Sequence, residues 1–124
     1  MRKILFLSEE NLTSHEMSLK KRISVKINGR YRLIDISGII CYKAEGSYTL
    51  IDIEGEEKII TSKNLKFFER TLPKTRFCRC HHSCIVNIGK IRSYNKNEIE
   101  MSDGSVLPVS RRRYAELAKM LEKK

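Results

Sequence analysis

The sequence has no hydrophobic run long enough to cross a membrane and no segment that resembles an export signal. A spanning helix needs about 20 consecutive apolar residues, but the apolar patch at residues 4–7 is soon followed by Glu9 and Glu10. The patch is also too short for a signal peptide and has no cleavage pattern behind it. We therefore expect a cytoplasmic chain of one domain, with no membrane partner and with reduced cysteines.

The residue patterns of common enzymes are also missing. The sequence contains no glycine-rich phosphate loop, no nucleophile elbow and no paired-carboxylate site. Asp35, Asp52 and Asp103 are predicted to lie in or beside turns, where aspartate usually bonds its neighbouring backbone. We therefore expect no enzymatic activity, no catalytic residue and no cofactor.

Cysteine and histidine gather in residues 77–88, but their spacing does not suit a metal. Common zinc sites take two cysteines two to four residues apart and a second, distant pair of ligands. We expect an extended, buried strand here, on which Cys78, Cys80, His82 and Cys84 share one face. Neighbours on such a face are about 6–7 Å apart, too far to close a tetrahedron. We predict no metal site, and cysteine as a core residue is the simpler interpretation.

Positive charge is abundant in the second half of the chain. Residues 63–124 carry 15 Lys/Arg against 6 Asp/Glu, a balance of +9, whereas residues 1–62 carry 10 against 9, a balance of +1. A folded domain with its positive charge on one side usually faces a polyanion. Solubility alone is the alternative explanation. We expect nucleic acid as the partner.

Alternating apolar residues and frequent turn signals predict a mainly β protein. Residues 1–20 have no clear period and are expected to be flexible or loosely docked, with the main domain at 21–124. The apolar patch in that segment would add an edge strand or a short helix. Turn signals at Asn28-Gly29, Glu54-Gly55 and Asp103-Gly104 favour an antiparallel sheet. Pro108 cannot donate to a ladder, so its strand is predicted at an edge.

Two helices are predicted. Asn64 would cap the first, which ends before Pro73. Ser110 would cap the second, whose apolar residues recur on one face at Tyr114, Leu117, Ala118 and Leu121. The first turn of this second helix carries Arg111–Arg113, although three cations there oppose the helix dipole and repel one another. We therefore predict that an outside anion neutralises them.

The remaining polar residues suit nucleic acid. Charged and hydroxyl donors bind phosphate oxygens, and the candidates are Lys63, Arg79, Ser83, Arg111 and Arg113. Arg112 and His82 could reach base edges, where arginine pairs well with guanine. The alternatives are a semi-buried His82 with internal partners and a solvated Arg112.

Three motifs in this sequence resemble those of LytTR-type DNA-binding domains, the output domains of bacterial response regulators of the LytR/AlgR class. Residues 77–87 carry Phe-x-Arg-x-His-x-Ser-x-Ile-Val-Asn. Residues 40–49 carry Ile-x-Tyr-x-x-Glu-Gly-x-Tyr-Thr, and residues 104–114 carry Gly-x-x-Leu-Pro-Val-Ser-Arg-Arg-Arg-Tyr. The resemblance covers about residues 20–121.

The resemblance implies an elongated antiparallel β fold with one short internal helix and a C-terminal helix. It implies a sequence-specific transcriptional regulator that reads promoter direct repeats in duplex DNA through loops in successive major grooves. Carried over by position, the base-contacting residues would be Ser47, Tyr48, His81, His82, Arg111 and Arg112. The phosphate-contacting residues would be Arg79, Ser83 and Arg113.

Residues 1–20 cannot form the receiver domain that family regulators usually carry. The chain would then be either a stand-alone protein of this family or a fragment of a longer regulator, and we expect the stand-alone form. Its partners would be duplex DNA, with a second copy on a direct repeat, a regulatory protein or RNA polymerase as further candidates. Two other functions stay open. One is an RNA- or ribosome-associated basic β interaction module, and the other is a thiol redox-sensing regulator that uses Cys78, Cys80 and Cys84.

Overall fold

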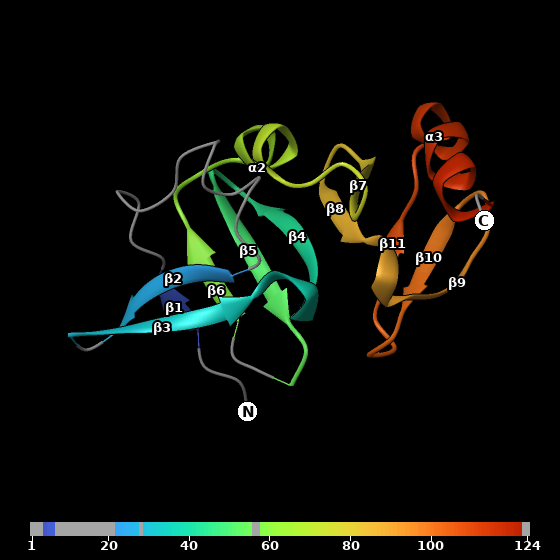
Figure 1. Cartoon of the computed structure of the whole chain (residues 1–124). Coiled ribbons are helices and arrows are strands. Elements are labelled where there is room, and N and C mark those ends of the chain that lie inside the picture. The colour runs from blue at the N-terminus through green and yellow to red at the C-terminus, as the bar shows by residue number, and fades with distance from the viewer. Residues whose placement is uncertain (1–3, 7–21, 28, 56–57, 123–124) are drawn as a thin grey trace.

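The computed structural model describes residues 4–6, 22–27, 29–55 and 58–122. Its architecture is mainly antiparallel β with two helices, as predicted. Figure 1 shows two parts side by side: a larger one built on the strands from β4 (Ile39–Glu45) to β6 (Lys58–Thr61), and a smaller one that carries the strands from β9 (Ile91–Tyr94) to β11 (Val106–Pro108) and the helix α3 (Arg111–Glu122). The strands β7 (Phe77–His81) and β8 (Cys84–Asn87) lie between the two parts, so the segment rich in cysteine and histidine is central in the fold.

A six-stranded sheet in the order β1-β6-β5-β4-β8-β7 begins in the larger part and ends in the region between the two parts. Its strands are β1 (Ile4–Phe6), β4 (Ile39–Glu45), β5 (Tyr48–Ile53), β6 (Lys58–Thr61), β7 (Phe77–His81) and β8 (Cys84–Asn87). β1 pairs in parallel with β6, and the other neighbours are antiparallel. The apolar patch near the N-terminus therefore supplies an edge strand, while residues 7–21 lie outside the described residues.

Two smaller sheets complete the β structure. β2 (Arg22–Ile27) and β3 (Arg30–Asp35) form the hairpin predicted at residues 28–29, where Gly29 has a left-handed φ of 78°. β9 (Ile91–Tyr94), β10 (Glu98–Met101) and β11 (Val106–Pro108) form the third sheet in the order β11-β10-β9. Pro108 therefore lies on an edge strand, as predicted. Short 3-10 turns at Ile36–Gly38 and Ile88–Lys90 connect strands.

The two predicted helices are present. α2 (Leu65–Thr71) is capped by Asn64, whose Oδ1 accepts from the Phe67 N–H at 2.9 Å. α3 (Arg111–Glu122) follows Ser110, whose Oγ accepts from the Arg113 N–H at 3.2 Å. Both side-chain caps satisfy amide groups that the helix itself leaves unpaired.

The strands β4, β8 and β7 separate two hydrophobic cores. Successive side chains of a strand point to opposite faces. Tyr42, Phe77 and Ile85 therefore join a core under α2, together with Phe68. Their neighbours along the same strands point to the opposite face and join a second core under α3. This second core contains Cys41, Cys78, Cys80, Cys84, Val86, Ile99, Met101 and Leu117. With both faces covered, the hairpin of β7 and β8 is held firmly on either side.

The prediction of one extended strand through residues 77–88 is wrong. Residues His82 and Ser83 form a tight turn, so the stretch is a hairpin whose register shifts between Arg79 and His81. Polar side-chain contacts stabilise this turn, although neither glycine nor proline marks it. Cys80 and Cys84 do not stand apart along one strand but meet across the hairpin, with 3.4 Å between their sulfur atoms.

Candidate nucleic-acid interface

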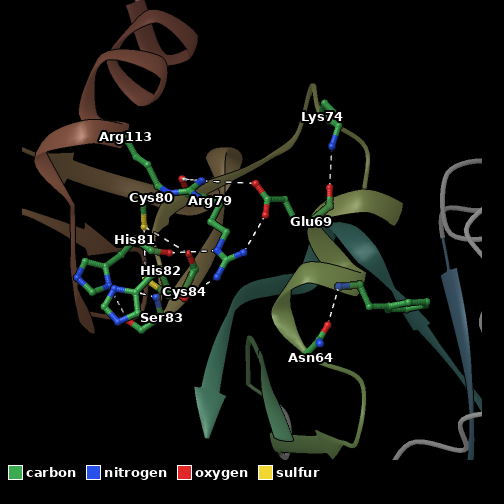
Figure 2. Close-up of polar contacts among 11 residues, drawn as sticks. Asn64, Glu69, Lys74, Arg79, Cys80, His81, His82, Ser83, Cys84 and Arg113 are labelled. Atoms are coloured by element: carbon green, nitrogen blue, oxygen red, sulfur yellow. Dashed lines mark hydrogen bonds and ion pairs between the residues drawn. The ribbon is translucent and has the colours of Figure 1, made fainter. Parts of the chain in front are cut away.

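The turn between β7 and β8, here called the hairpin loop (His81–Ser83), has a fixed conformation. The Ser83 backbone N–H donates to His81 Nδ1 at 3.1 Å, and Ser83 Oγ lies 2.8 Å from the same nitrogen. The rings of His81 and His82 lie against each other, with centroids 4.3 Å apart and planes tilted by 34°. Figure 2 shows the two imidazoles together at the end of the hairpin. The loop therefore presents a defined set of polar groups.

His81 has a defined tautomer and stays neutral more readily than a free histidine. A backbone N–H can only donate, so Nδ1 of His81 must offer a lone pair and Nε2 must carry the hydrogen. Burial, followed by the neighbouring His82 and Arg113, lowers the pKa of His81 below its ordinary value. The ring therefore has an N–H donor at Nε2 for an outside acceptor.

Arg79 is tied to the hairpin loop from inside. Its Nη2 donates to the His82 carbonyl at 2.6 Å, and its Nε donates to the His81 carbonyl at 3.3 Å. Its Nη1 forms an ion pair with Glu69 Oε1 at 2.8 Å, which links the loop to α2. Only 16% of the Arg79 side chain is exposed. All three guanidinium nitrogens therefore have partners within the chain (Figure 2).

The three arginines at the start of α3 differ from one another. Arg111 and Arg112 are exposed, and no described residue forms an ion pair with either. Arg113 is 18% exposed, and its Nη1 lies 3.4 Å from Glu69 Oε2. The expectation that an outside anion neutralises all three is therefore corrected in part, because Glu69 serves Arg113 from within.

Backbone hydrogen bonds connect the other two predicted reading segments to the hairpin. The Ala44 N–H at the end of β4 donates to the Ser83 carbonyl at 2.9 Å. The Ser110 N–H, just before α3, donates to the Cys80 carbonyl at 2.9 Å. The structure thus attaches both the β4–β5 turn and the start of α3 directly to the β7–β8 hairpin.

The β4–β5 turn is open to solvent. Gly46 has a left-handed φ of 61°, Ser47 is exposed, and Tyr48 is 49% exposed at the start of β5. Lys63 is half-buried, with its Nζ 5.1 Å from the centroid of the Phe67 ring. The Thr49 hydroxyl donates to the Lys63 carbonyl at 2.6 Å. Lys63 therefore belongs to the neighbourhood of this turn.

A groove beside α3 adds residues that the sequence analysis missed. It is lined by Lys96, Asn97, Val109, Arg111 and Tyr114, with two cations and no acidic side chain. The Val109 N–H donates to the Asn97 carbonyl at 3.0 Å, which holds the β9–β10 turn against this segment. Lys96 and Arg111 are 15 residues apart in the sequence, and only the fold places them on the same groove.

The aspartates predicted at turns are of two kinds. Asp35 Oδ1 accepts from the Ser37 N–H and Asp103 Oδ1 accepts from the Ser105 N–H, both at 3.0 Å, as expected for turns. The prediction is wrong for Asp52, which is buried on β5 and pairs with Lys58 Nζ at 3.1 Å. Burial is tolerated because the lysine compensates the charge.

The four cysteines are buried free thiols with different ionisation behaviour. Burial raises the pKa of Cys41 to about 12 and that of Cys78 to about 11, which leaves both thiols unreactive. The hydrogen bond from Cys80 lowers the pKa of Cys84, whereas the same contact raises the pKa of Cys80. In the described part of the chain, no three His, Cys, Asp or Glu side chains gather as a metal site would need.

The comparisons with known proteins agree on one family. Residues 29–122 match the family model of the LytTr DNA-binding domain. Among solved structures, the chain is similar to the LytTr DNA-binding domain of a methyl-accepting/DNA response regulator from Bacillus cereus. That likeness has a TM-score of 0.71 and 26% identity, and it covers 84% of this chain and 99% of the other. No curated protein matches the chain. Within the described residues, neither helix has the length and apolar character needed to cross a bilayer.

Proposed function

Because this chain belongs to the LytTR family of DNA-binding domains, we propose that it is a transcriptional regulator that recognises a specific sequence in duplex DNA. It reads direct repeats at promoters through loops placed in the major groove. The observation that carries this proposal is that two exposed polar segments are attached to the β7–β8 hairpin, which carries the third segment, the hairpin loop, at its end. The β4–β5 turn and the start of α3 each share a backbone hydrogen bond with the β7–β8 hairpin.

Base recognition falls to the side chains that lie free at the surface. Arg112 and Arg111 have exposed guanidinium groups, and arginine reads guanine through its O6 and N7 acceptors. Ser47 and Tyr48 approach from the β4–β5 turn. In the hairpin loop, His82 is exposed, and His81 offers the N–H of Nε2.

Phosphate contacts fix the domain on the duplex. Lys63 supplies an ammonium beside the β4–β5 turn. The Ser83 hydroxyl, which lies 2.8 Å from His81 Nδ1, would turn from that nitrogen to a phosphate oxygen, while the Ser83 N–H continues to donate to the ring. Arg79 and Arg113 contribute the N–H groups that their internal partners leave free, since guanidinium carries five donors. Lys96 and Asn97 extend this set along the groove beside α3, where Arg111 provides a second cation.

Selection from a random duplex library tests the proposal without a known operator. The full chain should enrich duplexes that contain two similarly oriented half-sites, and a second copy of the chain then occupies the second half-site. Single-stranded RNA in excess should not displace the selected duplex. If no duplex is enriched, or if RNA competes equally well, the basic β domain serves RNA or the ribosome instead.

A thiol-controlled version of the same regulator is a second candidate, and one contact favours it. The Cys80 and Cys84 sulfur atoms are 3.4 Å apart, directly beneath the hairpin loop. Hydrogen peroxide would oxidise the Cys84 thiolate to a sulfenic acid, which the Cys80 thiol would then attack. The S–S bond forms as the two thiols lose two protons and two electrons, and the peroxide is reduced to two molecules of water.

Binding before and after mild peroxide treatment tests the thiol candidate. A disulfide across the hairpin would move the loop, so the oxidised chain should lose affinity for the selected duplex and recover it with dithiothreitol. Cys84→Ser should bind equally well before and after peroxide. Unchanged binding by the wild-type chain would exclude redox control.

A further inference from the structure

We propose that Glu69 is a positioning residue for DNA recognition, which acts through Arg79 on the shape of the hairpin loop. This inference rests on the proposed function, because it concerns how the same loop distinguishes one DNA sequence from another. Glu69 lies on α2, outside the three segments that face DNA. Neither its residue type nor its place in the sequence predicts such a role.

Arg79 binds three groups at once. One guanidinium group binds the carbonyl oxygens of both His81 and His82 and the carboxylate of Glu69. The two carbonyls belong to the turn itself, so the orientation of the guanidinium sets the orientation of the two peptide groups that carry the histidines. A planar fork with five donors suits this task, whereas a lysine ammonium could not match its geometry.

The charge of Arg79 needs the carboxylate of Glu69 as its partner. Because the Arg79 side chain is only 16% exposed, its guanidinium group is largely withdrawn from water, and an anion must compensate its charge. Burial opposes ionisation of Glu69, but the hydrogen bond and charge of Arg79, with Arg113, hold the pKa of that carboxyl below its ordinary value. Glu69 therefore stays ionised at neutral pH and keeps Arg79 turned towards the loop.

Glu69 also joins separate parts of the fold. Its Oε1 holds Arg79 on β7, and its Oε2 lies 3.4 Å from Arg113 Nη1 on α3. Arg113 Nη1 also lies 3.5 Å from the Arg79 carbonyl, so the bonds form a closed network (Figure 2). α2, the hairpin loop and the start of α3 are thereby kept in one arrangement.

A role of Glu69 through charge alone and a role in positioning the hairpin loop predict different effects on DNA binding when Glu69 is removed. If the residue acted only through its charge, its removal would strengthen binding to every DNA, because one negative charge near the phosphates is gone. If it positions the loop, binding to a random duplex should hold or rise while the preference for the selected sequence falls. The ratio of the two dissociation constants separates these effects.

The experiment compares Glu69→Gln with Glu122→Gln in the full chain. Both variants lose one negative charge, and Glu122 is an exposed residue in the last turn of α3. We expect Glu69→Gln to lower the preference, which is the affinity for the selected duplex divided by the affinity for the scrambled duplex, about tenfold. A change of this size is typical of coupled contacts. Glu122→Gln should leave the ratio unchanged. In NMR spectra, only Glu69→Gln should shift the Ser83 amide and the His81 ring nitrogens.

A second variant keeps the test decisive if Glu69→Gln fails to fold. Arg79→Lys preserves the net charge but loses the fork that binds both carbonyls. It should lower the ratio while leaving the salt dependence of binding unchanged, because a phosphate contact is a matter of charge. Equal ratios for the wild type and both variants would overturn the inference and leave the proposed function intact. A wild type with no preference for any duplex would overturn the proposed function and the inference with it.

Discussion

The hairpin loop and the first turn of α3 both carry arginine, but their arginines have opposite environments. Arg79 binds two carbonyls and Glu69, and its side chain is largely buried. Arg111 and Arg112 are exposed and have no ion pair among the described residues. The difference separates two tasks within one interface: arginine beneath a loop shapes it, while arginine at a free helix end is available to an outside anion.

The two environments should differ most in stability. Arg79→Ala leaves two carbonyls and a carboxylate without their donor, so we expect it to lower the free energy of unfolding by about 2 kcal/mol. Arg112→Ala removes only an exposed side chain and should change it by less than about 0.5 kcal/mol. Urea unfolding of both variants measures the contrast. Equal losses would show that Arg79 does not support the loop.

Arg112→Ala, which should hardly change stability, should have a large effect on DNA recognition. Arg112→Ala should weaken binding to the selected duplex by about 1–3 kcal/mol, the usual value of one arginine–guanine contact. Binding to a scrambled duplex should change far less, so fluorescence anisotropy with both duplexes reveals the loss of selectivity. The comparison between the two regions fails if Arg112→Ala weakens both complexes by the same factor.

Lys96, in the groove beside α3, should contribute affinity without selectivity. Lys96→Ala should weaken binding to selected and scrambled duplexes alike and reduce the salt slope of log Kd by about 1. Lys119→Ala, an exposed lysine near the other end of α3, is the matched control and should leave the slope unchanged. A loss confined to the selected duplex would instead assign Lys96 to base recognition.

The smallest expected effect concerns pH. The pKa of His81 is lowered in the folded chain from an ordinary value of 6.5, so below that pH the unfolded chain binds more protons than the folded chain. Stability should therefore fall as the pH drops below about 6.5 and stay level above it. The decline should be weaker in His81→Gln when thermal unfolding is followed across this pH range. A parallel decline in both proteins would remove His81 as the cause.

Local signals in the sequence predicted most of the fold. Alternating apolar residues located the strands, and Asn64 and Ser110 marked the starts of the two helices. Pro108 correctly indicated an edge strand, because a missing N–H is a property of the residue alone. The family motifs also led to the DNA-binding family that the comparisons show.

The β7–β8 hairpin could not be predicted in the same way. The turn at His82 and Ser83 has no glycine or proline, and it depends on Arg79 and on the ring of His81. The role of Glu69 was hidden because its partners lie 10 and 44 residues away along the chain. Contacts of this range leave no periodic pattern, so only the fold brings these residues together.

One ratio of dissociation constants decides whether this domain reads a sequence in duplex DNA. The wild-type chain is titrated at physiological salt with the selected duplex and with a scrambled duplex of equal length and composition. We expect a ratio of about 10³ or more in favour of the selected duplex, as for other specific DNA-binding proteins. Equal affinity for the two duplexes would contradict it, because positive charge alone binds DNA without regard to sequence.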